Sequence, residues 1–268
     1  MRVFISVDME GISGVVSWPQ TNPGQFDYDR MRRLMTQEAN AAIEGAFEAG
    51  ATEVLVNDSH DGMRNIMLED LNPEARLITG DHKPMSMMEG CGPDFDAVFL
   101  IGYHSQASST GVLNHTYTTR VVHYSVNGKV VGETGMNAYI AGYHGVPVVL
   151  VSGDSVVAAE AKELLGTVEA VAVKDPKSQF AASCLHPTKA RALIKEAAVR
   201  ALKNLDKYKP LTPPAPSTVR LMFNASVYAD SAAIMPGAVR IDPLTVEFTA
   251  PEYLTAYRGA RTMMHLAY

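Results

Sequence analysis

The sequence predicts an α/β protein with a three-layer core built on a mostly parallel sheet, followed by a small C-terminal α+β region. Two observations lead to this prediction. Short buried-strand patterns alternate with longer helical patterns over the first 208 residues, and such alternation is typical of parallel sheets covered by helices. A segment with four prolines in the seven positions 210–216 then interrupts the pattern. We therefore expect an α/β domain over 1–208, a Pro-rich linker over 209–216 and an α+β region over 217–268.

Hydrophobic periodicity places the elements of the first half. A glycine at position 50 ends the first helix, as glycine commonly does just past a helix C-terminus. In order, we expect a strand at 2–7, a helix with its apolar stripe between 31 and 46, and strands at 53–56, 76–79 and 97–102.

The second half begins with a hairpin. Its turn is Asn127-Gly128, the dipeptide that most favours a type I′ turn. The expected elements are hairpin strands at 121–126 and 129–131, a helix at 136–143, a strand at 148–151, a helix at 155–165, a strand at 168–173 and a long helix after 187. Beyond the linker we expect strands at 218–224 and near 239 and 246, with helices from 227 and 251.

Composition excludes several classes of function. The net charge of −6 argues against nucleic acid or an anionic membrane as the main partner, because both require a basic surface. The two cysteines, Cys91 and Cys184, are too few for a disulfide framework, which favours a reducing cytoplasm. We find neither a secretory leader nor an apolar run of about 20 residues.

Metal-capable side chains follow three of the expected strands. Asp8 and Glu10 end the first strand, His60 follows the second and His104 the strand at 97–102. Side chains two positions apart on a strand leave it on the same face, and a right-handed βαβ crossover brings His60 to the same sheet edge as Asp8. One such residue alone is usually a loop or capping residue. Three strand ends in succession favour a shared site.

Glu133, at the start of the helix after the hairpin, completes a set of two histidines and three carboxylates. Such a set can hold two zinc ions if one carboxylate bridges, and a close pair of ions can both generate hydroxide and polarise a carbonyl. Cofactor-free acid–base catalysis is the chemical alternative, although it requires fewer groups than five. The sequence lacks the usual dinucleotide, P-loop, serine-hydrolase and zincin motifs.

Four motifs carry a resemblance to a known family. They are residues 6–14 (SVDMEGISG), 57–60 (NDSH), 102–104 (GYH) and 132–139 (GETGMNAY). Together they resemble the zinc-dependent D-aminopeptidases, members of which were formerly labelled dipeptide transport proteins. The resemblance extends from residue 1 to the Pro-rich segment and more loosely beyond it.

The resemblance implies specific roles. Asp8 would bridge two zinc ions, with Glu10 and His104 on one and His60 and Glu133 on the other. A catalytic histidine of the family falls on His115, whose role as nucleophile, acid–base group or oxyanion support stays open. Members release N-terminal D-amino acids, notably D-alanine, from short peptides and assemble as homodecamers.

We therefore predict a cytoplasmic two-zinc aminopeptidase that acts on short peptides through metal-activated water. Two alternatives stay open at this point. One is a dipeptide-binding, transport-associated protein without catalysis, and the other is a dinuclear metal amidohydrolase of different specificity.

Overall fold

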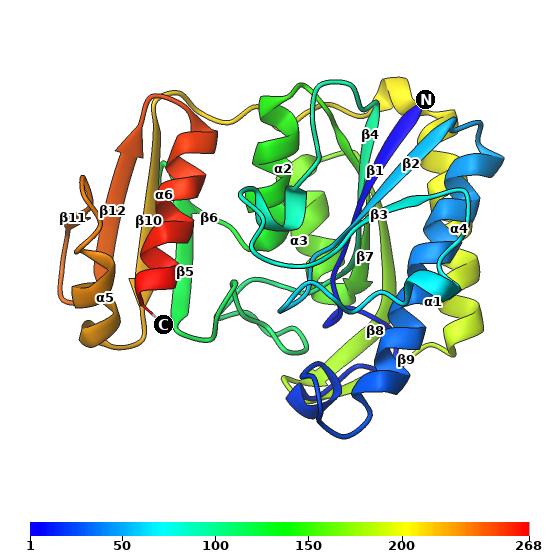
Figure 1. Ribbon diagram of the computed structural model, residues 1–268, viewed down its shortest axis with the longest axis horizontal. Coiled ribbons are helices and arrows are strands. Elements are labelled where there is room, and N and C mark those ends of the chain that lie inside the picture. Colours follow the sequence, from blue (N-terminus) through cyan, green and yellow to red (C-terminus); the bar gives the residue numbers. More distant parts are fainter. Residues whose placement is uncertain (268) are drawn as a thin grey trace.

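A seven-stranded sheet forms the centre of the computed structural model, which describes residues 1–267 (Figure 1). Neighbouring strands run parallel except for the last pair, β8 and β9, which are antiparallel. Across the sheet the order is β3 (Arg76–Ile78), β2 (Glu53–Asp58), β1 (Arg2–Val7), β4 (Ala97–Tyr103), β7 (Val148–Asp154), β8 (Glu169–Ser178) and β9 (Ala181–Cys184). The central strands are buried because both faces of the sheet are covered.

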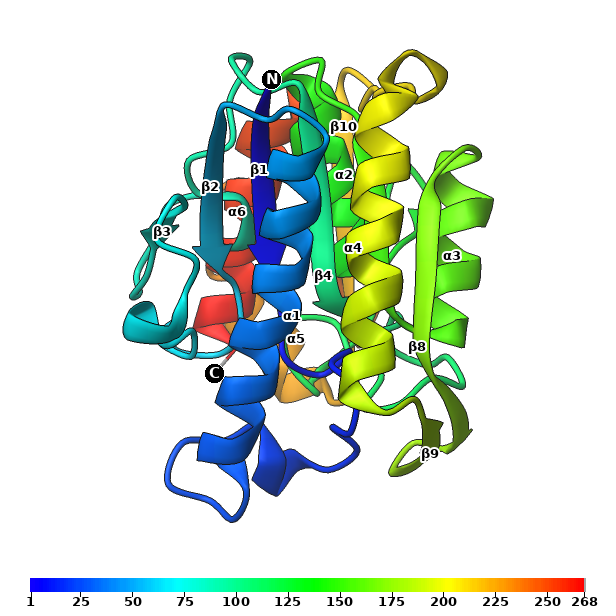
Figure 2. The same cartoon turned by 90° about the vertical axis from the view of Figure 1, so that its right-hand side faces the viewer.

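Helices cover both faces of this sheet. On one face lie α1 (Tyr28–Glu48) and α4 (Pro187–Lys203), which Figure 2 shows side by side in front of the strands. On the other lie α2 (Glu133–Tyr143) and α3 (Ser155–Leu165). The buried stripe of α1, which includes Met31, Met35 and Ile43, is the stripe expected from the sequence. The predicted three-layer, mostly parallel α/β core is therefore confirmed.

A second, antiparallel sheet stands beside the first (Figure 1). Its order is β11 (Val239–Arg240), β12 (Thr245–Ala250), β10 (Ser217–Phe223), β5 (Val121–Val126) and β6 (Lys129–Val130). The helices α5 (Ser226–Ala232) and α6 (Tyr253–Leu266) complete this part. The small α+β region is thus present, and it also includes the hairpin of β5 and β6, since β5 pairs with β10.

Two departures from the expected elements concern edges and connections. The strand expected at 168–173 continues to Ser178, and it is followed by the antiparallel strand β9, which was not predicted. The Pro-rich segment 209–216 has no helix or strand, yet it packs against α2, because a Cβ on Gly142 would lie 1.9 Å from the Leu211 carbonyl oxygen. Whether 1–208 and 217–268 are separate folding domains stays a prediction.

Short 3₁₀ helices occur at Trp18–Gln20, Leu68–Asp70, Ser86–Met88 and Leu205–Lys207.

Two glycines bring the ends of β1 and β4 together. Gly11 donates its N–H to the Gly102 carbonyl at 2.7 Å, and a Cβ on Gly11 would lie 2.0 Å from the Tyr103 carbonyl oxygen. Gly102 has a φ of +72°, and a Cβ there would lie 2.3 Å from the Asp8 carbonyl oxygen. Only glycine allows this close approach.

Within residues 1–267, no helix is long and apolar enough to cross a membrane.

Candidate metal centre

The residues expected at strand ends converge on one edge of the large sheet. Asp8 and Glu10 follow β1, His60 follows β2 and His104 follows β4, and β1 lies between the other two strands. Glu133 is the first residue of α2. All five side chains are buried, with no more than 6% of any residue exposed. The carboxyl-terminal edge of a parallel sheet is where such folds place their ligand sites.

Asp8 lies between two histidines. Its Oδ1 is 3.3 Å from His60 Nδ1, and its Oδ2 is 3.5 Å from His104 Nε2. His60 Nδ1 is also 2.9 Å from Glu10 Oε2, while His104 Nε2 is 3.3 Å from Glu133 Oε1. The two oxygens of one carboxylate therefore face two different imidazoles, each of which also approaches a second carboxylate.

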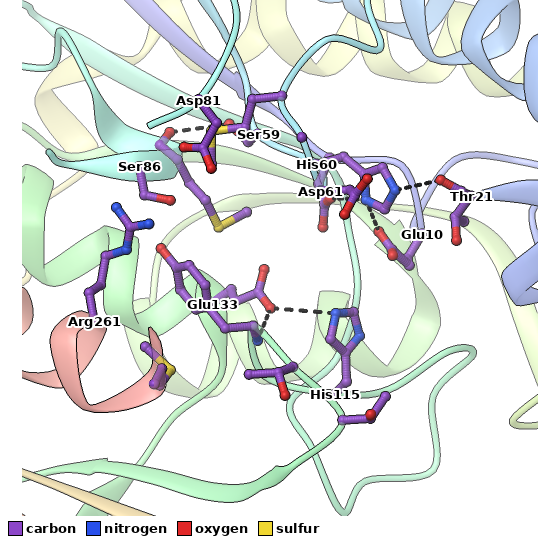
Figure 3. A pocket seen from close by; sticks show the side chains of 18 of the residues that line it. Glu10, Thr21, Ser59, His60, Asp61, Asp81, Ser86, His115, Glu133 and Arg261 are labelled. Carbon is purple, nitrogen blue, oxygen red and sulfur yellow. Dashed lines mark hydrogen bonds and ion pairs between the residues drawn. The ribbon is translucent and has the colours of Figure 1, made fainter. Parts of the chain in front are cut away.

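Backbone carbonyls orient the three histidines of the site. His60 Nε2 is 2.9 Å from the Thr21 carbonyl oxygen, as Figure 3 shows, and His104 Nδ1 is 3.0 Å from that of Ser105. His115 Nδ1 is 2.8 Å from the Leu113 carbonyl oxygen. Because a carbonyl only accepts, the ring nitrogen facing it carries the proton. The opposite ring nitrogen then offers a lone pair to the site, which is the usual arrangement of metal-binding histidines.

The donor atoms of this site fit a cation. Asp8 Oδ2, Glu10 Oε2 and His104 Nε2 are buried and accept or donate no hydrogen bond within residues 1–267, although buried polar atoms are normally satisfied. Ligand atoms of Asp8, Glu10 and His104 lie within 4.8 Å of one another, as do those of His104, His115 and Glu133. Nitrogen and carboxylate oxygen donors at this spacing suit zinc.

The buried acidic and histidine side chains of the site shift one another's pKa values. Burial, and then the charge of Glu10, raises the pKa of Asp8 to about 7. Burial alone would lower the pKa of His104, but Glu133 and Asp8 outweigh it and raise that pKa to about 10. Burial opposes ionisation of Glu10 too, yet the cationic form of His60 holds the pKa of Glu10 well below its ordinary value. A bound cation would take over the role of the imidazole protons, so metal binding displaces protons here.

His115 comes from the loop between β4 and β5 and lies flat on His104. The ring centroids are 4.0 Å apart with an interplanar angle of 12°. Its Nε2 is 3.9 Å from Glu133 Oε1, and Trp18 contacts the ring edge to face at 5.3 Å between centroids. Burial, and then the charge of His104, lowers the pKa of His115. Both effects favour the neutral form of this histidine.

A buried lysine holds the chain that follows β1. Lys174 Nζ donates to the carbonyl oxygens of Glu10, Ile12 (3.1 Å) and Val15 (2.6 Å). Because all three donor positions of the ammonium group are used within one loop, Lys174 fixes the backbone that carries Glu10. Lys174 lies just past the strand expected at 168–173, and the sequence does not predict its burial, since lysine is almost never fully buried.

A cavity of about 800 Å³ opens beside the donor cluster. Asp8, Glu10, His60, His115 and Glu133 line it, whereas His104 lies beneath the His115 ring. Figure 3 shows Glu10, His60, His115 and Glu133 around the cavity, together with Arg261 from α6 on the opposite wall. The structure therefore brings all six predicted residues together. Arg261, Tyr117 and Ser86 also line the cavity, but they lie in none of the four sequence motifs and were not predicted.

Fold and site together define an α/β protein with a buried cluster of potential metal ligands beside a peptide-sized cavity. A model of the peptidase M55 family, described as D-aminopeptidase, matches residues 1–262. The chain belongs to this family.

Two comparisons agree with this assignment. A D-aminopeptidase of Bacillus subtilis (strain 168) is 46% identical over 268 residues, which is 100% of this chain and 98% of the relative. A solved structure, described as the Zn-dependent D-aminopeptidase DppA from Bacillus subtilis, a self-compartmentalizing protease, superposes with a TM-score of 0.98 at 46% identity. The superposition covers 98% of the chain in that structure and 100% of this chain. The family resemblance seen in the motifs is confirmed, and the chain is a peptidase, a hydrolase of peptide bonds.

Proposed function

We propose that this chain is a zinc-dependent aminopeptidase that releases N-terminal D-amino acids, with D-alanine favoured, from short peptides by attack of metal-activated water. The observation that carries the proposal is the position of Asp8, whose two oxygens face His60 and His104 at 3.3 and 3.5 Å. A carboxylate in that position suits a bridge between two metal ions. The similarity to a Zn-dependent D-aminopeptidase supports zinc as the metal.

We assign the ligands in two sets that share Asp8. Glu10 and His104 would complete the first set, and their ligand atoms lie within 4.8 Å of one another and of Asp8. His60 and Glu133 would complete the second. Two zinc ions held in this way would supply Lewis acidity toward the scissile carbonyl and a water of lowered pKa.

The chain's own contribution to proton transfer is His115. Because Nδ1 donates to the Leu113 carbonyl, the Nε2 lone pair is directed into the site, 3.9 Å from Glu133 Oε1. A neutral imidazole in this place can accept a proton and return it to the leaving amine. Trp18, stacked edge to face on the ring, holds the imidazole in position and limits its contact with water.

The test compares two histidines that have different proposed roles. His115→Ala should keep its zinc and fold but lose about 10²–10⁴-fold in kcat on a D-alanyl dipeptide, as expected for a general acid–base group. His104→Ala should lose zinc as well as activity, because its imidazole is a proposed ligand. His123→Ala is the matched control, since that side chain is exposed on β5 and lies outside the cavity. Zinc content is measured beside turnover for each variant.

Four outcomes contradict the proposal in different ways. Near-normal kcat in His115→Ala removes the role given to His115. Active enzyme without bound metal removes the zinc centre. Cleavage of L-alanyl but not D-alanyl dipeptides by the wild type leaves a dinuclear amidohydrolase of other specificity, whereas tight binding without cleavage supports the dipeptide-binding alternative.

The proposal extends to assembly and location. A relative described as self-compartmentalizing supports a homo-oligomer, and we propose the decamer that the family resemblance implies. Both cysteines, Cys91 and Cys184, are free thiols, which is compatible with the proposed cytoplasmic location.

A further inference from the structure

Arg261 gives one wall of the cavity a positive charge. Among the described residues 1–267 that line the cavity, it is the only lysine or arginine. Figure 3 shows its guanidinium directed into the cavity, across from His60 and Glu10. The acidic side chains in the lining are Asp8, Glu10, Asp61, Asp81 and Glu133.

The guanidinium is held in place without being neutralised. Its Nη1 donates to the Lys83 carbonyl oxygen at 2.8 Å, and its Cζ lies 5.8 Å from the centroid of the Tyr117 ring. Within residues 1–267 the Nε is buried and has no hydrogen-bond partner. The Asp81 carboxylate, which also lines the cavity, accepts from the Lys83 N–H at 3.1 Å and lies 3.2 Å from His82 Nδ1.

Ser86 adds a second unused donor beside the first. The Ser86 side chain is fully buried beside the Tyr117 hydroxyl, and its own hydroxyl makes no hydrogen bond of good geometry within residues 1–267. The Ser86 N–H donates at 3.0 Å to the same Lys83 carbonyl that accepts from Arg261. One shared acceptor therefore brings the Arg261 guanidinium close to the Ser86 backbone, and Figure 3 shows the Ser86 side chain beside the guanidinium. A planar anion with two oxygens can accept from both, and arginine suits carboxylates in particular.

Tyr117 lies between the pair formed by Arg261 and Ser86 and the metal centre. The Tyr117 N–H donates to Glu133 Oε1 at 2.7 Å, while the ring of Tyr117 faces the guanidinium of Arg261. Each residue of an extended peptide spans about 3.3–3.6 Å. A peptide of only a few residues can therefore have its first peptide bond at the metal centre and its last residue at Arg261.

We propose that Arg261, assisted by Ser86, binds the carboxylate of the substrate on the leaving-group side, namely the C-terminal carboxylate of a di- or tripeptide. This inference rests on the proposed aminopeptidase function and adds a specificity determinant to it. The anchor selects short peptides, because a longer chain would place its carboxylate beyond Arg261. An acidic side chain could present the same chemical group and is therefore included in the test.

The test measures kcat/KM for three zinc-loaded enzymes on three substrates. The substrates are D-Ala-D-Ala, its C-terminal amide, and D-Ala-D-Glu amide, in which the only carboxylate is on the side chain. The wild type should prefer the acid to the amide about 10- to 100-fold, the range expected for one charge-assisted hydrogen-bonded contact. In Arg261→Gln that ratio should fall toward one. Arg258→Gln, one turn earlier on α6 and exposed, should keep the ratio.

The outcomes separate this inference from the proposed function. Equal kcat/KM for acid and amide in the wild type, or an unchanged ratio in Arg261→Gln, overturns the role of Arg261. Preference for D-Ala-D-Glu amide over D-Ala-D-Ala overturns the C-terminal source of the carboxylate. If Arg261→Gln does not fold, the inference is tested on the wild type and Ser86→Ala. The acid-to-amide ratio of kcat/KM should then be smaller in Ser86→Ala than in the wild type, and equal ratios overturn the inference.

A failure to release D-alanine from any of the three substrates refutes the proposed function alone. Calorimetric titration of the acid and the amide then tests Arg261. Tighter binding of the acid by wild type but not by Arg261→Gln supports the anchor, and equal affinities overturn it.

Discussion

Asp8 is the residue on which both proposed metal sets depend. It faces His60 with one oxygen and His104 with the other, whereas Glu10 belongs only to the proposed set that contains His104. Removing Asp8 therefore takes a ligand from both ions, and removing Glu10 takes a ligand from one.

We expect Asp8→Ala to retain close to no zinc and Glu10→Ala to retain roughly one ion per chain, as measured by elemental analysis after gel filtration. Asp61→Asn is the control, because Asp61 lines the same cavity but belongs to neither proposed set. Equal zinc loss in Asp8→Ala and Glu10→Ala would show that Asp8 does not act as the bridge.

Glu38 is a buried carboxyl group outside the metal centre. Its Oε1 accepts from the Ser13 N–H at 2.9 Å, while Oε2 has no partner within residues 1–267. Burial raises the pKa of Glu38 from 4.5 to about 7, and the Ser13 N–H opposes this only in part. The folded protein thus holds a proton that the unfolded chain releases at lower pH.

The sign of the resulting pH dependence follows from this raised pKa. The stability contributed by protonated Glu38 is fully present below about pH 4.5 and is lost as the pH rises through about 7. Glu38→Gln should therefore gain stability over the wild type by about 2–3 kcal/mol between pH 5 and pH 8. Urea unfolding of both proteins at the two pH values measures the difference, and parallel stabilities at both would refute the assignment.

At the scale of the elements, Gly11 couples the end of β1 to the end of β4. A Cβ at this position would lie 2.0 Å from the Tyr103 carbonyl oxygen, which is backbone and cannot move aside. We expect Gly11→Ala to displace the segment that carries Glu10, lowering the free energy of unfolding by about 2 kcal/mol or more and weakening zinc binding. Thermal unfolding and zinc titration measure the two effects.

Gly92→Ala is the matched control for this substitution. Gly92 has no heavy atom within 4 Å of the added Cβ and has no positive φ. Similar losses in both variants would mean that the effect comes from removing a glycine and not from the contact between β1 and β4.

The strands of the large sheet could be predicted because their apolar runs are short and end in polar clusters. The positions of Asp8, His60 and His104 followed from the rule that parallel strands end at one sheet edge. The hairpin's membership of the second sheet could not be predicted, since β5 pairs with β10 across about 90 residues without a local signal. Arg261 was missed for the same reason. On α6 it has the pattern of an ordinary surface arginine, and only packing brings it to the cavity.

At the scale of the whole molecule, the proposed homo-oligomer requires contact surfaces between copies of the chain. Phe26 is 81% exposed in the loop before α1, and Ile234 is 74% exposed after α5. Exposed side chains of this kind mark candidate interaction surfaces when they cluster, and the proposed decamer would cover part of them. We expect light scattering to report a particle many times the 29.0 kDa of one chain.

Phe26→Ser and Ile234→Ser should reduce that particle mass if these residues lie between subunits, with Thr255→Ala on the exposed side of α6 as the control. A particle of single-chain mass at micromolar concentration would exclude compartment formation. Substrate size would then be limited by the cavity of each chain alone.

The position of Trp18 allows the site to be followed by tryptophan fluorescence. It is the only tryptophan of the chain, and its indole lies against His115, which in turn stacks on His104. Indole fluorescence of the unlabelled protein therefore originates entirely beside the reaction centre. Rapid-mixing experiments can use this single native fluorophore to time the arrival of a ligand, and no dye or engineered label is required.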